Sequence, residues 1–165
     1  MHIKKRVLNL PASFSVNATS PAGATVAYSA SATDNLDPSP TLSCVPPSGS
    51  VFPIGTTTVN CTATDHAGNS ATGSFTVRAK GPGEQITALI DKTVVFVGPP
   101  ALENVLKATL RTAVNALATG RKPAACAALA VYVSTVRAVP TNVLTAAQKA
   151  ELIADATRIR AVIGC

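Results

Sequence analysis

The sequence predicts an α+β fold in two segregated modules, an N-terminal antiparallel β-sandwich and a C-terminal module of four helices. Three observations support this prediction. Apolar residues alternate with a period of two before residue 80 and recur at helical spacing after it. No Lys or Arg occurs between Val7 and Val77, whereas basic residues are frequent after Gly81. Two of the four cysteines fall on each side of this change.

The sandwich is expected over residues 1–80. Runs rich in Val, Thr, Ser and Ala alternate apolar and polar residues, and turn segments such as SPAGA, VPPSGS and DHAGN separate them. Short strands at this spacing are typical of an antiparallel sandwich. The segment VLNLPASFSV at 7–16 lacks the apolar core of a signal peptide, so we interpret it as the first strand. We therefore expect the secretion signal to be absent from this chain, as in a fragment of a longer secreted protein.

The helical module is expected over residues 84–165, after the Gly- and Pro-rich segment KGPGE. Its apolar spacing predicts helices at 84–96, 100–119, 123–138 and 145–163. GPP at 98–100 is a typical helix start and Gly120 a typical helix end. Thr145 with Gln148 fits a capping box. The first helix is expected to be the weakest, because TVVFV is β-branched and aromatic.

The four cysteines permit three pairings, and the module boundary separates Cys44 and Cys61 from Cys126 and Cys165. Cys44 and Cys61 both have the inward phase of their strands, so we expect a bridge across the sandwich core. Cys126 begins the third helix and Cys165 follows the fourth, so an antiparallel helix pair would bring them together. Zinc or redox chemistry is the less favoured alternative, because there is no C-x-x-C and the chain has two histidines. Disulfides indicate an oxidising location outside the cytoplasm.

A resemblance to known families is carried by longer motifs. The stretch LSCVPPSGSVFPIGTTTVNCTATDHAGNSATGSFTV at 42–77 closely resembles the hyalin repeat (HYR) module, with its paired cysteines, PPSGSxFPxGTTTV run and CTATDxAGN turn. The preceding residues fit the opening strands of that module, so the likeness covers nearly all of 8–79. It implies an immunoglobulin-like sandwich of secreted or surface proteins linked to adhesion, without catalytic residues.

The second half is similar to FIMAH, a small helical module at the C-terminal end of secreted bacterial proteins. The matching pieces are EQITALIDK, ALENVLKATLRTAVNALATGRKPAAC, VYVSTVRA and LTAAQKAELIADATRIRAVIGC. The sequence departs from that pattern at TVVFVGPP, so the end of the first helix is the least defined part. The resemblance implies neither an enzymatic role nor an established ligand.

Two polar turns of the sandwich are candidates for a metal site. Asp34, Asn35 and Asp37 lie in DNLD, and Asp65 and Asn69 lie in DHAGN. If both loops lie at one end of the sandwich, their oxygens would suit Ca²⁺, the one cofactor considered and the less favoured interpretation of these turns. Asp and Asn are also good turn residues, since they tolerate left-handed backbone and close Asx-turns. We interpret DHAGN first as a bend and second as part of an ion site.

The sequence does not indicate an enzyme. His66 lies in a polar turn, and no serine occupies a G-x-S-x-G elbow. The acids of the first half lie in hydrophilic turns, without the burial that raises the pKa of a catalytic acid. Nucleic acid is not an expected partner, because the basic residues, including Lys107 and Arg111, are not interleaved with aromatic ones. No apolar run is long enough to span a membrane.

We therefore expect a non-catalytic, extracellular, bacterial attachment or spacer protein that binds a protein or glycan at the cell surface. One alternative is a subunit of an extracellular fibre formed by head-to-tail self-association. Strands without charged residues favour edge pairing, and the two halves carry charges of opposite sign. The other alternative is the glycan-binding accessory part of a secreted hydrolase.

Overall fold

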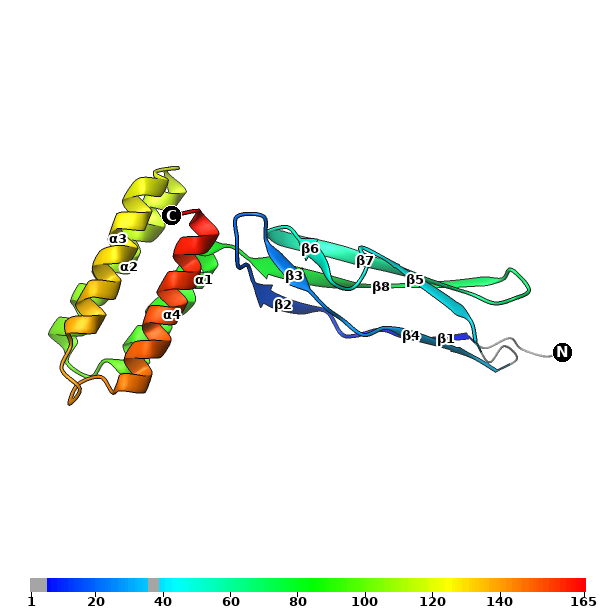
Figure 1. The fold of residues 1–165 in the computed structure, drawn as a ribbon, viewed down its shortest axis with the longest axis horizontal. Helices are drawn as coiled ribbons and strands as arrows, with labels where there is room; N and C mark the ends of the chain where they lie inside the picture. The colour runs from blue at the N-terminus through cyan, green and yellow to red at the C-terminus, as the bar shows by residue number, and fades with distance from the viewer. Residues whose placement is uncertain (1–5, 36–38) are drawn as a thin grey trace. The chain divides into compact units, whose positions relative to one another are not determined.

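The structure, a computed structural model, describes residues 6–35 and 39–165, which form two compact units (Figure 1). The first unit reaches to Val16 and continues over Ala22–Ala79, and the second consists of Asn17–Pro21 and Lys80–Cys165. The described strands precede residue 81 and the helices follow it. The predicted α+β fold in two segregated parts is therefore confirmed.

The first unit is built from short strands. In chain order these are β1 (Arg6–Asn9), β2 (Phe14–Asn17), β3 (Ala24–Val26), β4 (Ser31–Asp34), β5 (Thr41–Val45), β6 (Ser50–Phe52), β7 (Gly55–Thr64) and β8 (Ser70–Lys80). One sheet has the strand order β2-β8-β7-β5, whereas β1 pairs with β4 and β3 pairs with β6. The pairings of β7 with β5 and with β8 are antiparallel, as are β1–β4 and β3–β6.

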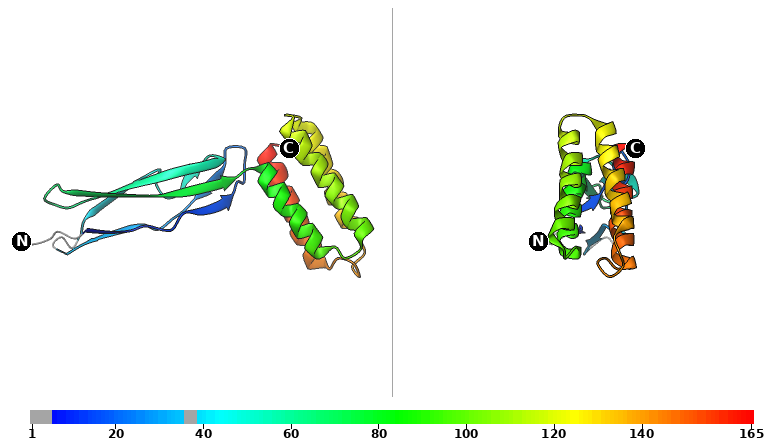
Figure 2. Two further views of the ribbon diagram at one scale, coloured as in Figure 1. Left: turned by 180° about the vertical axis from the view of Figure 1, so that it is seen from behind. Right: turned by 90° about the vertical axis from the view of Figure 1, so that its left-hand side faces the viewer.

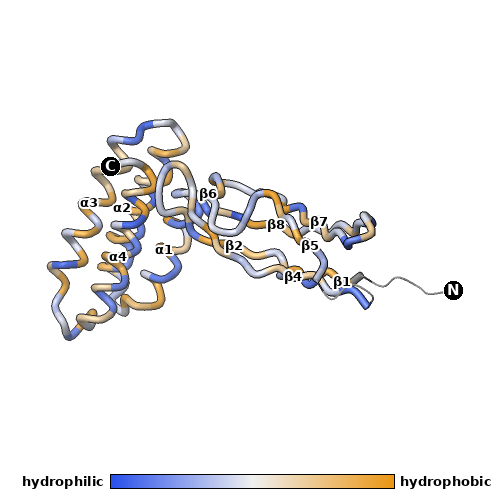
Figure 3. The backbone as a smooth tube through the Cα atoms, turned by 45° about the vertical axis from the view of Figure 1, so that its right-hand side comes forward, coloured by the Kyte–Doolittle hydropathy of each residue, from blue (hydrophilic) through white to orange (hydrophobic). Residues whose placement is uncertain are grey.

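The core of the sandwich comes from the alternation of side chains along these strands. Phe52 and Val26 come from β6 and β3, and they belong to one buried cluster with Val59, Phe75 and Val77 of β7 and β8. Figure 3 shows the corresponding apolar colouring along β7 and β8. The β3–β6 pair and the four-stranded sheet thus bury a shared apolar interior, while the intervening Thr and Ser residues face outward.

The interpretation of 7–16 as a single strand is wrong, because this segment forms two strands in different sheets. β1 pairs with β4 in register Leu8↔Ala32, and β2 is the neighbour of β8. The break between them contains Pro11, which has no N–H to donate to a ladder. The chain therefore leaves one layer at Pro11 and enters the other.

The second unit contains helices α1 (Pro82–Phe96), α2 (Pro100–Ala118), α3 (Lys122–Ala138) and α4 (Ala146–Ile163). Figure 2 shows them side by side, and adjacent pairs in the bundle are α1 with α2 and α4, and α3 with α2 and α4. Each helix directs one apolar face inward; the buried positions include Leu89, Leu110, Leu129 and Ile159.

The helix ends agree with the predicted ones to within two residues. Thr145 caps α4 with a capping box, because its N–H donates to Oε1 of Gln148 at 2.9 Å and its Oγ1 accepts from the N–H of Gln148 at 3.2 Å. α1 continues through its β-branched residues to Phe96. Burial of Leu89 and Thr93 in the bundle overrides the low helix propensity of this segment.

Candidate functional site

The turn between β7 and β8 is closed by Asp65 and Asn69. The main-chain N–H of Asn69 donates to Oδ1 of Asp65, and its side-chain Nδ2 donates to Oδ2, each at 2.8 Å. Gly68, with φ 81°, donates its N–H to the carbonyl of Asp65 at 3.0 Å. Both carboxylate oxygens of Asp65 therefore accept local hydrogen bonds, as in the bend that we expected first.

The other predicted calcium ligands belong to the loop after β4. Asp34 is the last residue of β4 and Asn35 follows it, whereas Asp37 lies outside the described residues. Figure 1 places the end of β4 and the β7–β8 turn at the same end of the first unit. Within residues 6–35 and 39–165, no group of three or more His, Cys, Asp or Glu side chains is placed to hold a metal ion. The calcium site thus stays a prediction.

The first disulfide joins Cys44 to Cys61, which lie directly opposite each other on β5 and β7. The expected bridge across the core is therefore wrong, because the bond links neighbouring strands of one sheet. Alternation indicated that both side chains point inward, but it carries no information about which strands are neighbours. The Cα atoms are 4.1 Å apart, the short separation of a non-hydrogen-bonded antiparallel pair.

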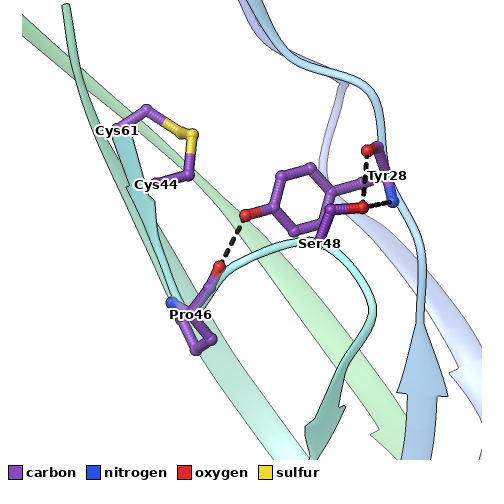
Figure 4. Close-up of a disulfide and its surroundings, with 5 residues drawn as sticks. All are labelled: Tyr28, Cys44, Pro46, Ser48 and Cys61. Atoms are coloured by element: carbon purple, nitrogen blue, oxygen red, sulfur yellow. Dashed lines mark hydrogen bonds between the residues drawn. A yellow bond between two sulfur atoms is a disulfide. The ribbon is translucent and has the colours of Figure 1, made fainter. Parts of the chain in front are cut away.

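Tyr28 and Ser48 organise the loop beside this disulfide (Figure 4). Oγ of Ser48 accepts from the main-chain N–H of Tyr28 and donates to its carbonyl, both at 2.8 Å. The hydroxyl of Tyr28 donates to the carbonyl of Pro46 at 2.5 Å, and its ring meets Phe75 edge-on at 5.0 Å. Burial raises the pKa of Tyr28. The hydroxyl of Ser48 thus makes the two hydrogen bonds to the Tyr28 backbone that a neighbouring strand would otherwise make, just beyond the end of the β3–β6 pairing.

The second disulfide joins Cys126, in the first turns of α3, to Cys165, after the end of α4. Gly164 has φ 90° and ends the helix, and the N–H of Cys165 donates to the carbonyl of Arg160 at 3.0 Å. This is the hydrogen-bond pattern of a helix that ends in a left-handed residue. The reversal at Gly164 brings the Cα atoms of the two cysteines to 5.8 Å, so the helices need no bend to meet.

A buried amide connects α1 and α4 within the second unit. Gln85 is 3% exposed, and its Nε2 donates to the carbonyls of Lys80 at 2.8 Å and Ala18 at 3.0 Å. Its Oε1 accepts from Nε of Arg158 at 3.0 Å, and Arg158 also pairs with Asp155 at 2.8 Å. Helical periodicity does not predict the contacts of Gln85 with Ala18 and Arg158, since these residues are far apart in the sequence.

The same two helices share an ion-pair cluster. Nζ of Lys92 lies 2.6 Å from carboxylate oxygens of both Glu151 and Asp155. The hydrogen bond to Asp155, followed by the one to Glu151, raises the pKa of Lys92. The lysine side chain is 31% exposed, so water screens this cluster and its contribution to stability is modest.

A buried hydroxyl pair lies deeper in the bundle. Oγ1 of Thr93 donates to the carbonyl of Leu89 at 2.7 Å and lies 2.7 Å from the hydroxyl of Tyr132. Because Thr93 has one hydroxyl proton, Tyr132 is then the donor of the second bond. Burial raises the pKa of Tyr132 to about 12. The pair satisfies two polar groups inside an apolar core.

The described surface carries open hollows. Two of them, of about 190 and 320 Å³, are both lined by Ala30; the first also contacts Tyr28 and Cys44. Another, of about 340 Å³, is lined by polar α1 residues such as Glu84 and Asp91 and by Lys80. The residues lining these hollows include no histidine, and their cysteine is in a disulfide.

Residues 15–79 match the family model of the HYR domain. The HYR domain is an extracellular, adhesion-type module and not an enzyme family. Searches of curated proteins and of solved structures find no match to the chain. The four helices are consistent with the helical module predicted at 84–165, while its likeness to FIMAH stays a prediction. None of the described helices combines the length and the hydropathy required to cross a membrane.

Proposed function

We propose that this chain is a non-catalytic attachment protein that works outside the cell. The match of residues 15–79 to an adhesion-type family is the observation that carries the proposal. The two disulfides support the location, since such bonds persist in oxidising surroundings. An attachment role requires a stable folded surface and no reactive group.

The outer face of the four-stranded sheet supports binding through neutral groups. Thr58, Asn60, Thr72 and Ser74 are exposed on β7 and β8, and they alternate with the buried core residues. Hydroxyl and amide groups donate and accept hydrogen bonds without charge. We infer that the partner is a protein or glycan of the cell surface, and that its binding depends weakly on salt concentration.

We assign residues 84–165 the role of a rigid spacer, similar to FIMAH. The Cys126–Cys165 disulfide and the contacts of Gln85 and Arg158 fix the helices relative to each other. The bundle interior is mainly apolar. A spacer of this kind holds an adhesion domain away from its attachment point without taking part in recognition.

The proposal is tested by coating beads with the disulfide-intact full chain and measuring their detachment under flow. The surfaces are cells of the source organism, its purified surface glycans and its surface proteins. Native beads should resist detachment on at least one surface, and soluble chain should compete. A parallel series in excess chelator tests the predicted calcium site.

The matched control is the same chain after reduction and alkylation of its cysteines under denaturing conditions. This treatment keeps the composition and charge of the coating but removes the fold. If native and unfolded coatings detach equally from every surface, the attachment function is wrong. Loss of adhesion in chelator alone would support calcium binding, and unchanged adhesion would contradict it.

A further inference from the structure

Strand β5 forms one edge of the four-stranded sheet in the described part of the chain. The sheet order gives it β7 as a neighbour on one side and no described strand on the other. Its five residues, TLSCV, include no charged side chain and no proline. Proteins commonly protect such an edge with charged residues, prolines or bulges, so a bare edge is a template for another strand.

The register with β7 shows which backbone groups of β5 face this edge. Cys44 and Cys61 form a non-hydrogen-bonded pair, so the N–H and C=O of Cys44 point away from β7. The same holds two residues earlier for Leu42. The edge therefore offers two donors and two acceptors. Pro40 and Pro46, which lack an N–H, bound this stretch at both ends.

Three of the five side chains on this edge strand are apolar and incompletely covered. Val45 is 65% exposed, and Leu42 and Cys44 are half-buried members of the sandwich core. The open hollow of about 190 Å³ lies beside them. A strand added here would extend the sheet and shield these side chains from water.

We propose that this edge binds the same edge of a second copy, in an antiparallel pair centred on Ser43. This inference rests on the proposed attachment function and gives it a homotypic partner. Leu42 of each copy then lies opposite Cys44 of the other copy. The N–H and C=O groups of both residues therefore form hydrogen bonds between the two copies. Val45 lies beside Thr41 of the second copy.

Three features favour a second copy over an unrelated peptide. The free groups at positions 42 and 44 complement themselves under a two-fold rotation. The edge carries no charge, so two identical edges meet without repulsion. The flanking prolines limit both strands to the same length. The contact is isologous and stops at a dimer, unlike the head-to-tail fibre considered from the sequence. Its small buried area makes the dimer weak.

The test is sedimentation velocity of the full chain from micromolar to millimolar concentration. Wild type should dimerise reversibly. Ser43→Lys and Ser43→Asp each place like charges opposite each other and should raise the dimer dissociation constant ~5-fold or more. An equimolar mixture of the two variants should restore association. Thr25→Lys is the control, since it adds the same charge at an exposed position of β3, which belongs to another sheet.

A second readout is amide hydrogen exchange, in which Leu42 and Cys44 should become protected as concentration rises. A wild type that stays monomeric would overturn the inference, and so would a Ser43→Lys chain that dimerises like wild type. A bead experiment separates failure of the dimer from failure of the attachment function. Beads coated with the Ser43→Lys chain should no longer cluster with each other but should still adhere to a foreign surface. If wild-type beads do not adhere to any foreign surface, only the proposed attachment function is contradicted.

Discussion

Arg158 donates its Nε–H to Oε1 of Gln85 at 3.0 Å, and this bond joins the last helix of the chain to the first. The side-chain Nε2 of Gln85 also donates hydrogen bonds to the carbonyls of Ala18 and Lys80. Arg158 is held in place by Asp155. One buried side chain therefore satisfies three polar partners, so its loss leaves several groups unpaired at once.

Replacing Gln85 with methionine tests this arrangement, because the volume is nearly kept and the polar groups are removed. We expect the free energy of unfolding of the helical unit to fall by about 1–3 kcal/mol. Urea denaturation followed by far-ultraviolet circular dichroism measures this change. Thr87→Ala is the control, since Thr87 is exposed on the same helix. Equal losses in both variants would contradict the role of Gln85.

Alkaline pH should destabilise the helical unit through Tyr132. Its pKa is raised from 10.0 to about 12 in the folded chain, so the stabilising contribution is complete below pH 10. That contribution, about 2–3 kcal/mol, is lost as pH rises from 10 toward 12. The raised pKa of Lys92 acts in the same direction above its ordinary value of 10.5.

Tyr132→Phe should therefore lower stability at neutral pH by about 1 kcal/mol, through the hydrogen bond lost to Thr93. Between pH 10 and 12 its stability should fall less steeply than that of wild type. Urea unfolding at closely spaced pH values provides the comparison. Parallel curves for the two proteins would show that Tyr132 titrates normally.

Ser48→Ala should weaken the sandwich, because Tyr28 loses a donor and an acceptor together. Both groups can reach water, so we expect a decrease of about 1 kcal/mol or less in the free energy of unfolding. Ser74→Ala, an exposed strand position on β8, serves as the matched control. Thermal melts monitored by tyrosine fluorescence would detect the difference. No difference between the two variants would show that Ser48 does not hold Tyr28.

Gly164→Ala should strain the end of α4, because φ at this position is 90°. We expect the helical unit to lose about 1 kcal/mol of stability. Gly98→Ala is the control, since an added Cβ there meets open space and its backbone is not left-handed. Differential scanning calorimetry of the oxidised proteins compares the two. A larger loss in Gly98→Ala would contradict the assignment.

The elements of this fold could be predicted because their signals are local. Period-two alternation located β7 and β8, and helical spacing with the Thr145–Gln148 capping box located α4. The prediction of a single strand over 7–16 was wrong for a local reason as well. Its alternation is continuous across Pro11, whose missing N–H lies in the break between β1 and β2.

The candidate site depended on contacts between distant residues. Asp65 and Asn69 are four positions apart, so turn chemistry indicated their hydrogen bonds in advance. Tyr28 with Ser48, and Gln85 with Arg158, are separated by many residues, and no periodicity relates them. That β5 has one neighbour among the described strands likewise depends on the order of strands in the sheet.

Apart from the break at Pro11, the sequence by itself determined which segments are strands and helices, which side of each is apolar, and which cysteines share a half of the chain. These properties follow from side-chain periodicity and short-range backbone preferences, which act along a single element. The tertiary structure decided that Cys44 and Cys61 are neighbours in one sheet, that a buried glutamine joins two helices, and that β5 has a single neighbour among the described strands. Those outcomes depend on how elements distant in the chain pack together, which no single element specifies.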